Sequence, residues 1–356
     1  MSSTSSAIPT TMRASVLLKQ GVIEMQERPV PTPGDGEVLV RVGSVGVCGS
    51  DVHYYKHGRI GDMVVTAPIV LGHEVSGTVV AVGRGVAEER VGDRVAIDPQ
   101  VPCRTCRQCK TGRSNLCPYM EFYATPPFDG TFCDYVTAPS DQAYLVPDSL
   151  SDESAALLEP LSVGLWAAHK ADVGPGDQVL VAGAGPIGAM VAQAVRACGA
   201  TDVVVTDFVD SRRERILDFG ATRALHPVAD AAEIAALRAD AFVDCSGATP
   251  AVLSGIASTR GGGTVVLVGL GAEEMPLPVQ LIATREINVT GVFRYVDTWP
   301  RGIALTSAGT VHLDDMVTAR YPLEQVEDAL NADSDPLSMK AVVVVNPATT
   351  DTEVTA

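Results

Sequence analysis

Residues 178–207 read QVLVAGAGPIGAMVAQAVRACGATDVVVTD. An apolar run rich in β-branched residues is followed by a glycine-rich turn, an apolar helical segment and a second β-branched run. This order predicts a strand, a turn, a helix and a strand. The turn, GAGPIG over residues 183–188, fits the pattern G-x-G-x-x-G. A lone match can be only a glycine-rich turn, but this one follows a strand and opens a helix, as a dinucleotide-binding unit requires.

Each glycine of this turn has an expected role in holding a dinucleotide. Gly183 allows the tight turn, Gly185 lets backbone N–H groups approach a pyrophosphate, and Gly188 lets the helix pack closely on the strand. The N-terminus of the helix then faces the anion. Asp207 ends the second strand, 24 residues after Gly183. A carboxylate there can accept hydrogen bonds from an adenosine ribose and repels a 2′-phosphate, so we expect NAD rather than NADP.

The length and composition limit the classes of function. The chain of 356 residues is long enough for two domains, and 46% hydrophobic against 19% charged residues allows large cores. A formal net charge of −17 argues against a nucleic-acid surface. No apolar run reaches the length of a membrane span, and the first residues lack the apolar core of a signal peptide. We therefore expect a cytoplasmic protein with reduced thiols that acts on a small molecule.

Two kinds of hydrophobic pattern follow one another along the chain. Up to about residue 145, short β-type segments separated by proline and glycine predict a small β-rich domain. A helical stretch is expected at 152–171, and from residue 178 on the alternation of β-type and helical segments predicts a doubly wound parallel sheet. Helical segments at 299–308 and 323–331 and a strand at 340–345 are expected to return to the first domain. The expected elements of the second domain are strands at 203–206, 241–244, 264–268 and 287–291 and helices near 210–219, 232–238 and 250–258.

Four cysteines in the loop VPCRTCRQCKTGRSNLCP have the spacing C-x2-C-x2-C-x7-C. Short spacers turn the chain back on itself, so four thiolates can converge on one tetrahedral zinc ion, and four sulfurs leave no coordination position open for chemistry. We therefore interpret the loop as a structural zinc site. Two disulfides are an alternative that a reducing compartment disfavours, and the x2 spacing alone does not exclude an iron–sulfur site. The four residues are Cys103, Cys106, Cys109 and Cys117.

A second set of possible metal ligands is dispersed along the chain. Cys48 lies in VGVCGSDVHYYKHGRIGD, His73 and Glu74 lie in LGHEVSG, and Glu159 lies in LLEPLSVG. One thiolate, one imidazole and a carboxylate make a mixed site that can leave a position open for a substrate oxygen, as a zinc alcohol dehydrogenase needs. The remaining cysteines have no such partners and are expected to be buried apolar residues. They are Cys133, Cys198 and Cys245.

These motifs together resemble the zinc-dependent medium-chain dehydrogenases, and most closely the sorbitol (polyol) dehydrogenases among them. The sequences CGSDVHYYKHGRIG, GHEVSGTVVAVG, the four-cysteine loop, EPLSVGLWA, GAGPIG, VTD, VGLG and VFRYVDTWP occur in the order which that family shows. The resemblance covers residues 12–346. It implies an α/β fold with a GroES-like β-rich catalytic domain over 12–160 and 296–346 and a doubly wound Rossmann domain over 161–295.

The resemblance also implies roles for individual residues. Cys48, His73 and Glu74 are expected to bind a catalytic zinc ion, and Glu159 to reach it directly or through water. The expected contacts to a polyol are Tyr54, Glu159, Arg294 and Tyr295. The expected cofactor-binding residues are Gly183, Gly185, Pro186, Ile187, Gly188, Asp207, Arg212, Val268, Gly269, Leu270, Val292, Phe293 and Arg294.

The expected activity is reversible transfer of a hydride from a secondary hydroxyl of a polyol, such as sorbitol or xylitol, to NAD, giving a ketose. Two zinc ions per chain and a homotetramer are expected with it. Ser50 and His53 can pass the released proton to solvent, or only shape their loop, and Asp51 can orient a zinc ligand. Arg212 complicates the cofactor preference, because a nearby arginine can favour a 2′-phosphate.

Two departures from the pattern weaken the assignment of sorbitol itself as the best substrate. All four cysteines of the loop are kept, whereas some sorbitol dehydrogenases lack them, and Tyr55 stands where animal members carry Trp. A related zinc dehydrogenase acting on L-threonine or a simple secondary alcohol shares nearly every motif, but VFRYVDTWP supplies an Arg and a Tyr suited to several hydroxyls. A binding protein without activity is a further alternative, which the intact set of zinc ligands argues against.

Overall fold

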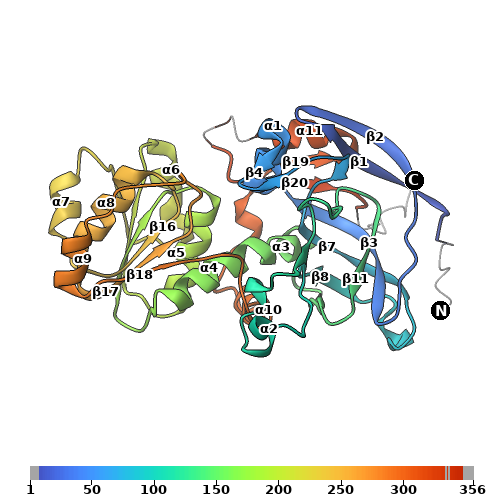
Figure 1. Cartoon of the computed structure of the whole chain (residues 1–356), viewed down its shortest axis with the longest axis horizontal. Coiled ribbons are helices and arrows are strands. Elements are labelled where there is room, and N and C mark those ends of the chain that lie inside the picture. The colour runs from blue at the N-terminus through green and yellow to red at the C-terminus, as the bar shows by residue number, and fades with distance from the viewer. Residues whose placement is uncertain (1–7, 333–334, 336, 348–356) are drawn as a thin grey trace, which may run out of the picture.

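The computed structural model describes residues 8–332, 335 and 337–347. Two lobes lie side by side, with helix α4 (Leu158–Lys170) between them (Figure 1). One lobe holds a parallel sheet covered by helices, and the other is built mainly from antiparallel strands. The expected combination of a β-rich unit with a parallel α/β unit is therefore confirmed.

The parallel sheet has six strands in the order β15-β14-β13-β16-β17-β18. Every neighbouring pair is parallel, as the alternation of strands and helices predicts. The strands are β13 (Gln178–Ala182), β14 (Asp202–Thr206), β15 (Arg223–Leu225), β16 (Ala239–Asp244), β17 (Thr259–Leu267) and β18 (Asn288–Gly291). The helices of this lobe are α5 (Pro186–Ala197), α6 (Asp210–Arg215), α7 (Ala231–Ala236), α8 (Thr249–Ser258) and α9 (Val279–Arg285).

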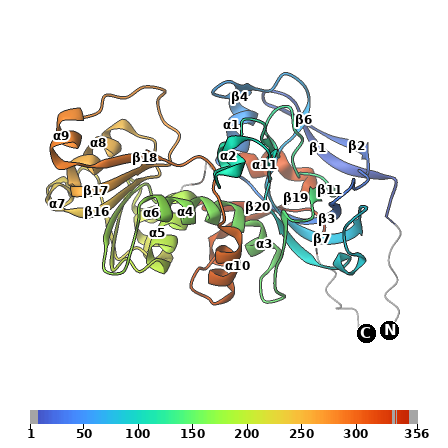
Figure 2. The same cartoon turned by 60° about the horizontal axis from the view of Figure 1, so that its bottom comes forward.

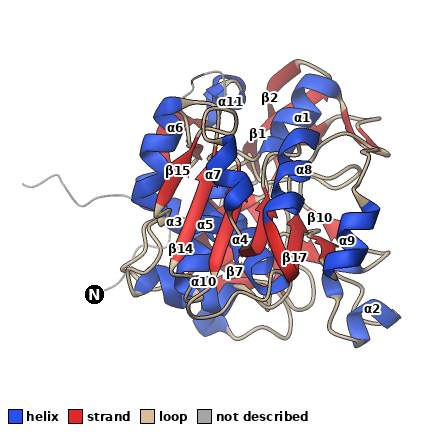
Figure 3. Cartoon of the chain, turned by 90° about the vertical axis from the view of Figure 1, so that its left-hand side faces the viewer, coloured by secondary structure: helices blue, strands red, loops and turns tan. Residues whose placement is uncertain are grey.

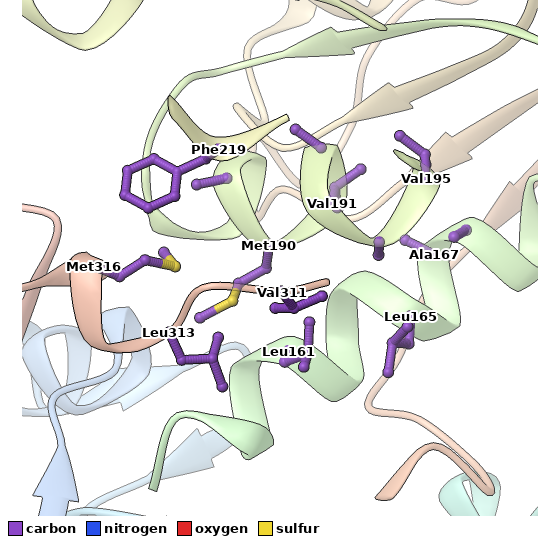
Figure 4. Packing of buried hydrophobic residues seen from close by; sticks show 14 of the residues in the cluster. Leu161, Leu165, Ala167, Met190, Val191, Val195, Phe219, Val311, Leu313 and Met316 are labelled. Carbon is purple, nitrogen blue, oxygen red and sulfur yellow. The ribbon is translucent and has the colours of Figure 1, made fainter. Parts of the chain in front are cut away.

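Both faces of this sheet are buried, which explains why its strands read as continuous apolar runs. Alternate residues point to opposite faces, so Val181 packs with α4 and α5 while Leu180 packs with α7 and α8. Helices lie on both sides of the strands in Figure 3. Figure 4 shows the first of these cores, where Leu161 and Leu165 of α4 lie below Met190 of α5. Each such side chain, when fully buried, contributes about 1.5–3 kcal/mol of transfer free energy.

The second lobe is organised around a seven-stranded sheet in the order β12-β8-β7-β3-β20-β19, with β11 also paired to β3. A smaller sheet, β2-β1-β6, packs against it. The strands are β1 (Thr11–Lys19), β2 (Val22–Pro29), β3 (Glu37–Gly46), β4 (Arg59–Ile60), β5 (Met63–Val64), β6 (Ile69–Val70), β7 (Glu74–Val82), β8 (Arg94–Ile97), β9 (Gln100–Val101), β10 (Glu121–Phe122), β11 (Tyr135–Pro139), β12 (Ala143–Leu145), β19 (Val317–Pro322) and β20 (Lys340–Val344).

The end of the described chain returns to this lobe. Strand β20 pairs antiparallel with β3, so that Val343 lies opposite Val45. Helix α11 (Val326–Leu330) packs in the same core, whereas α10 (Trp299–Ser307) packs against α4. The boundaries at 160–161 and 295–296 remain a prediction, and residues 333, 334 and 336 of the expected catalytic domain lie outside the described residues. The remaining helices are α1 (Gly49–His57), α2 (Arg107–Lys110) and α3 (Asp152–Ala156).

Some local expectations differ from the structure. The helical stretch at 152–171 is two helices, α3 and α4, with Leu157 between them. Pro160 explains the break, because it has no N–H to donate to the carbonyl of Ala156 and is tolerated only in the first turn of a new helix. Cys133 is buried as expected, and Cys245 is partly buried, but the expectation for Cys198 was wrong because it is exposed. It follows α5 at the surface end of that helix.

Candidate functional site

The glycine-rich turn joins β13 to α5 with the geometry of an anion-binding loop. Gly183 has φ 99°, a left-handed conformation that favours glycine. A Cβ atom on Gly188 would lie 1.9 Å from the Gly183 carbonyl oxygen, so only glycine lets the helix start this close to the turn. A Cβ on Gly185 would meet nothing within 4 Å, which leaves the space beside the helix N-terminus open. Pro186 is the first residue of α5 and removes a donor that has no partner in the helix.

Asp207 is held beside this turn by two backbone bonds. Its Oδ2 accepts a hydrogen bond from the N–H of Ala184 at 2.8 Å, and its Oδ1 accepts one from the N–H of Val209 at 2.9 Å. The carboxylate lines a mainly apolar hollow of about 260 Å³ together with Phe208 and Val228. A flat base can lie against the apolar lining of this hollow, with its ribose next to Asp207. Each carboxylate oxygen of Asp207 can accept a further hydrogen bond from the ribose hydroxyls.

Arg212 does not line the hollow beside Asp207, where a 2′-phosphate would lie. It lines a different hollow, of about 300 Å³, together with Cys48, His53 and Pro186. Its Nε is buried and has no hydrogen-bond partner among the residues that the structure describes. Arg212 therefore faces the space between the turn and the second lobe, where it can contact the phosphates of a dinucleotide.

The other expected cofactor residues lie at the carboxyl ends of β17 and β18. The N–H groups of Val268 and Gly269 both donate to the Asp244 carbonyl at 2.9 Å, and the N–H of Val292 donates to the Leu267 carbonyl at 2.9 Å. These bonds bring the two loops next to the glycine turn at one edge of the sheet, where open α/β sheets bind their ligands. Large apolar side chains are left exposed there, with Leu270 74% and Phe293 51% accessible, and Ile187 is partly buried.

Three possible zinc ligands converge where β3 ends and β7 begins. The ligand atoms of Cys48, His73 and Glu74 all lie within 4.8 Å of one another. Glu74 is the first residue of β7 and pairs with Gly46 at the end of β3, while Cys48 caps the N-terminus of α1. Adjacent strands thus bring together residues that are 25 positions apart in the sequence. A thiolate, an imidazole and a carboxylate at this separation fit a zinc ion with an open coordination position.

Asp51 supports this ligand set from the first turn of α1. Its side chain accepts hydrogen bonds from the N–H of Cys48 at 3.1 Å and the N–H of Gly72 at 2.9 Å. Its Oδ1 also lies 3.5 Å from Nδ1 of His73. A carboxylate on one ring nitrogen leaves the other nitrogen of the imidazole for a metal, which is the arrangement found around protein-bound zinc.

Lys340 approaches the same ligand set from β20. Its Nζ lies 2.7 Å from Oε1 and 2.6 Å from Oε2 of Glu74, and it donates to the Val47 carbonyl at 2.6 Å. Burial acts to lower the pKa of Lys340, but Glu74, Cys48 and Glu159 together outweigh it and raise the pKa above its usual value. Lys340 could not be identified from the sequence, because no motif marks a lysine 266 positions away from its partner.

Glu159 does not join the compact ligand set but lies next to it. Its Oε1 accepts a hydrogen bond from the Tyr295 hydroxyl at 3.0 Å. Burial, opposed by His73 among other groups, raises the pKa of Glu159 to about 7. Asp98 lies 3.5 Å from the same hydroxyl, and burial raises its pKa to about 7 as well. Asp98 was not expected at the site, since it occupies a connection between β8 and β9 that matches no motif.

Arg294 and Tyr54 lie next to Glu159 and Tyr295, and we call these four residues the polar wall. The Arg294 guanidinium stacks over the rings of Phe122 and Phe293, at 4.5 and 4.7 Å from their centroids. Burial lowers the pKa of Arg294, and Tyr295, Tyr54 and Glu159 act on it in the opposite sense. Burial raises the pKa of Tyr54, so its hydroxyl stays protonated at neutral pH. The four expected polyol contacts therefore face one region beside the zinc ligands.

The two residues expected to pass a proton to solvent lie on α1. Ser50 is partly buried in the first turn, and His53 is exposed one turn later, with its ring centroid 4.9 Å from that of His57 and the two rings tilted by 54°. His53 lines the same hollow as Cys48. It therefore has access both to the hollow and to solvent.

The four cysteines of the loop gather around one point without bonding to each other. The Sγ of Cys106 lies 3.5 Å from that of Cys109 and 3.9 Å from that of Cys117, and Cys103 lies 4.0 Å from Cys109. All four thiols are free. These separations match the edge of a sulfur tetrahedron around zinc, which is about 3.8 Å for Zn–S bonds of about 2.3 Å. They exclude the disulfide alternative and fit a structural zinc site.

Comparisons with known proteins agree with this geometry. Residues 34–148 match the alcohol dehydrogenase GroES-like domain, and residues 186–308 match the zinc-binding dehydrogenase family. The chain belongs to the zinc-dependent medium-chain dehydrogenases. Similar members of this family include the sorbitol dehydrogenase of Gallus gallus, 43% identical over 94% of this chain and 96% of that protein, and the sorbitol dehydrogenase of Bacillus subtilis (strain 168), 44% identical over 91% and 94%.

Solved structures of other dehydrogenases resemble this medium-chain dehydrogenase along nearly its whole length. L-idonate 5-dehydrogenase from Escherichia coli matches with a TM-score of 0.89 and 29% identity, over 94% of this chain and 98% of that one. The 2R,3R-butanediol dehydrogenase from Bacillus subtilis matches with a TM-score of 0.86 and 31% identity, over 94% and 100%. The expected GroES-like and Rossmann units of the medium-chain dehydrogenase fold are thereby confirmed. Among the described residues, no helix combines the length and hydrophobicity that crossing a membrane requires.

Proposed function

We propose that this chain is an NAD-dependent polyol dehydrogenase that oxidises a secondary hydroxyl of a substrate such as sorbitol or xylitol to a ketone, reversibly. The observation that carries the proposal is the polar wall of Tyr54, Glu159, Arg294 and Tyr295 next to the zinc ligands. The identity of 43–44% to sorbitol dehydrogenases over more than nine-tenths of the chain supports it.

A polyol needs such a wall because it is neutral and offers hydroxyl groups but little apolar area. Its affinity must come from several directed hydrogen bonds. Arg294 can donate up to five, Tyr54 and Tyr295 can donate or accept, and Glu159 can accept. A simple secondary alcohol or L-threonine has no use for so many donors spread along one side of the cleft, so a polyol is preferred to both.

The residues of the site would hold the two groups that carry the reaction. Cys48, His73 and Glu74 would bind the catalytic zinc, and the glycine turn with Asp207 would hold NAD. When bound, zinc acts as a Lewis acid on a hydroxyl and the nicotinamide ring accepts a hydride. Tyr295 fixes the carboxylate of Glu159 at the substrate side of the ligand set, so the chain supplies a rigid frame that orients the reacting hydroxyl.

A proton must leave the site with each oxidation. Ser50 and His53 are proposed to carry it, since Ser50 lies two residues after Cys48 and His53 opens from the same hollow to solvent. This route gives a role to an exposed histidine that lies five residues along α1 from the partly buried Cys48. Replacing His53 by Asn should slow the oxidation most at low pH, where bulk base is scarce.

A homotetramer in the cytoplasm is proposed as the working form. Strand β18 is an edge strand of the parallel sheet, and its residues are largely exposed. An edge with unpaired backbone groups readily pairs with a second copy. Large apolar side chains exposed on this lobe, among them Val279 at 70%, support association. The free thiols of this chain fit a reducing compartment. Light scattering on the zinc-loaded protein measures the subunit number.

A substrate panel tests the proposed function. The zinc-loaded protein is assayed with sorbitol, xylitol and other polyols, L-threonine and 2-butanol, with NAD and with NADP, and in reverse with ketoses. A polyol with NAD should give the highest kcat/KM. Higher values for L-threonine or 2-butanol would assign the chain to another substrate class, and no turnover with any of them would favour the binding protein.

A further inference from the structure

Arg294 has an unusual backbone conformation. Its φ of 56° lies in the left-handed region, which an arginine adopts only when its surroundings hold it there. Asn288–Gly291 (β18) ends just before it, and Tyr295 follows it, fully buried, with only 1% of its surface exposed. Arg294 and Tyr295 of the polar wall are therefore adjacent in the sequence. The backbone of Arg294 holds a conformation that it does not adopt without support from its surroundings.

Two side-chain amides hold the carbonyl groups on either side of Arg294. The Nδ2 of Asn115 donates to the carbonyl of Phe293 at 2.8 Å. The Nε2 of Gln100 donates to the carbonyl of Tyr295 at 3.2 Å. Both amides are buried, with 5% of each residue exposed, so the two bonds are not in competition with water.

Both amides come from residues 98–122, a segment of the second lobe that carries the four cysteines. We call this segment the cysteine lobe. Asn115 lies two residues before Cys117, and Gln100 begins β9, which pairs with β10. Phe122 of β10 lies under the Arg294 guanidinium. In Figure 2 the segment between β18 and α10 runs beside α2 of this lobe. The cysteine lobe thus contacts both the backbone and the side chain of Arg294.

Gln100 is itself fixed in place by Asp98. Both the backbone N–H and Nε2 of Gln100 donate to Oδ1 of Asp98, at 3.1 and 3.3 Å. The same carboxylate lies 3.5 Å from the hydroxyl of Tyr295. One short stretch, residues 98–100, therefore holds Tyr295 at its carbonyl and at its hydroxyl.

We propose that Asn115 and Gln100 are positioning residues that set polyol specificity by holding Arg294 and Tyr295 in the conformation that meets the substrate hydroxyls. The proposal rests on the proposed function, in which these two side chains contact the polyol. It gives the cysteine lobe a role in substrate discrimination in addition to its role in stability. Loss of either amide lets the segment leave the left-handed conformation, and the guanidinium then no longer faces the cleft.

Asn115→Ala, Arg294→Ala and the double variant test the proposal. Asn346→Ala is the matched control, because Nδ2 of Asn346 also donates to a backbone carbonyl, that of Val42 at 2.9 Å, in the same domain but in a different part of it. KM and kcat are measured for a polyol and for 2-butanol with NAD. The Kd for NADH, from fluorescence titration, and the Tm are measured for each variant.

The expected result is a KM for the polyol that rises about tenfold or more in Asn115→Ala, with kcat/KM for 2-butanol and the Kd for NADH changed by less than about threefold. The double variant should be no worse than Arg294→Ala, because the amide acts only through the arginine. Asn346→Ala should lower the Tm without raising the KM. Equal losses on the polyol and on 2-butanol, or additive effects in the double variant, overturn the proposal.

A second variant keeps the test open if Asn115→Ala does not fold. Gln100→Met keeps the size of the side chain and removes its donors, and it should raise the polyol KM in the same selective way. If Arg294→Ala raises the polyol KM but neither amide variant does, the positioning role is wrong and the proposed substrate contact stands. If Arg294→Ala shows no selectivity, the substrate contact is wrong and the positioning role with it.

Discussion

Lys340 places its ammonium group 2.6 Å from the carboxylate of Glu74, with 4% and 1% of the two side chains exposed. The pair lies behind the proposed zinc site, on the side of β20. A carboxylate that is buried as deeply as this one needs a positive partner, and zinc and Lys340 are the two that the site offers. The negative charge of Glu74 is therefore balanced even when no metal is bound.

Replacing Lys340 by Met should destabilise the zinc-free protein strongly. Removing one partner of a buried pair leaves an uncompensated charge and costs about 3–5 kcal/mol. The loss should be smaller with zinc bound, because the metal supplies positive charge to Glu74. Urea unfolding with and without zinc measures both values, and the Glu74→Gln/Lys340→Met double variant is the control, which should be more stable than Lys340→Met alone. The same stability loss in both metal states would contradict this explanation.

Replacing Cys106 by Ser should remove the structural zinc and lower the Tm, because metal binding at such a site is coupled to folding. Elemental analysis should find two zinc ions per chain in the unchanged protein and one in this variant. Turnover of 2-butanol should persist in the protein that stays folded. His73→Ala should show the opposite pattern, with activity lost and the structural zinc retained. One zinc per chain in the unchanged protein, with Cys106→Ser fully occupied, would rule out a separate structural site.

Asp98→Asn should change how stability depends on pH. Burial raises the pKa of Asp98 to about 7, so between pH about 4 and about 7 the folded chain keeps a proton that the unfolded chain releases. The stability due to this group is complete below pH about 4 and is lost as the pH rises through about 7. The Tm of Asp98→Asn minus that of the unchanged protein should therefore increase from pH 5 to pH 8. Asp148→Asn, at a fully exposed carboxyl, serves as the control, and a constant difference for Asp98→Asn would mean that its carboxyl titrates normally.

NAD should be preferred to NADP by about tenfold or more in kcat/KM, equivalent to about 1.4 kcal/mol. The Asp207 carboxylate is fixed by the N–H groups of Ala184 and Val209, so it cannot move away from a 2′-phosphate. Asp207→Ser should reduce the preference by removing the negative charge. Steady-state kinetics with both cofactors measure it. A higher kcat/KM with NADP in the unchanged protein would show that Arg212, not Asp207, decides the choice.

The fold was largely predictable because its signals are local. The apolar run of β13, the turn at Gly183 and the helix that follows lie within thirty residues, and the periodicity of each is visible in the sequence. Elements with weak local signals were missed, such as β15, which has three residues, and α9, which follows Pro278 and has no fully buried residue. The break at Leu157 was signalled by Pro160 but was not recognised.

The candidate site was predictable only where a residue type announces its chemistry. Cysteines and histidines in glycine-bearing loops are candidates for metal ligands, so Cys48 and His73 could be singled out, and the structure brings them together. Asn115 and Lys340 could not, because their roles depend on contacts with residues 178 and 266 positions away. An asparagine or a lysine is most often a solvated surface residue, and only the packed structure shows that these two are buried with their partners.

The position of Lys340 on the last described strand also bears on how the protein is made. A ribosome releases Cys48, His73 and Glu74 long before it releases β20, which completes the sheet beside β3. During that interval the nascent chain presents a thiol, an imidazole and a carboxylate without their buried ammonium. Because the lobe can close over this set only after residue 340 has emerged, we expect metal insertion to be a late, post-translational event, and chains truncated before β20 to be poor zinc binders that chaperones retain.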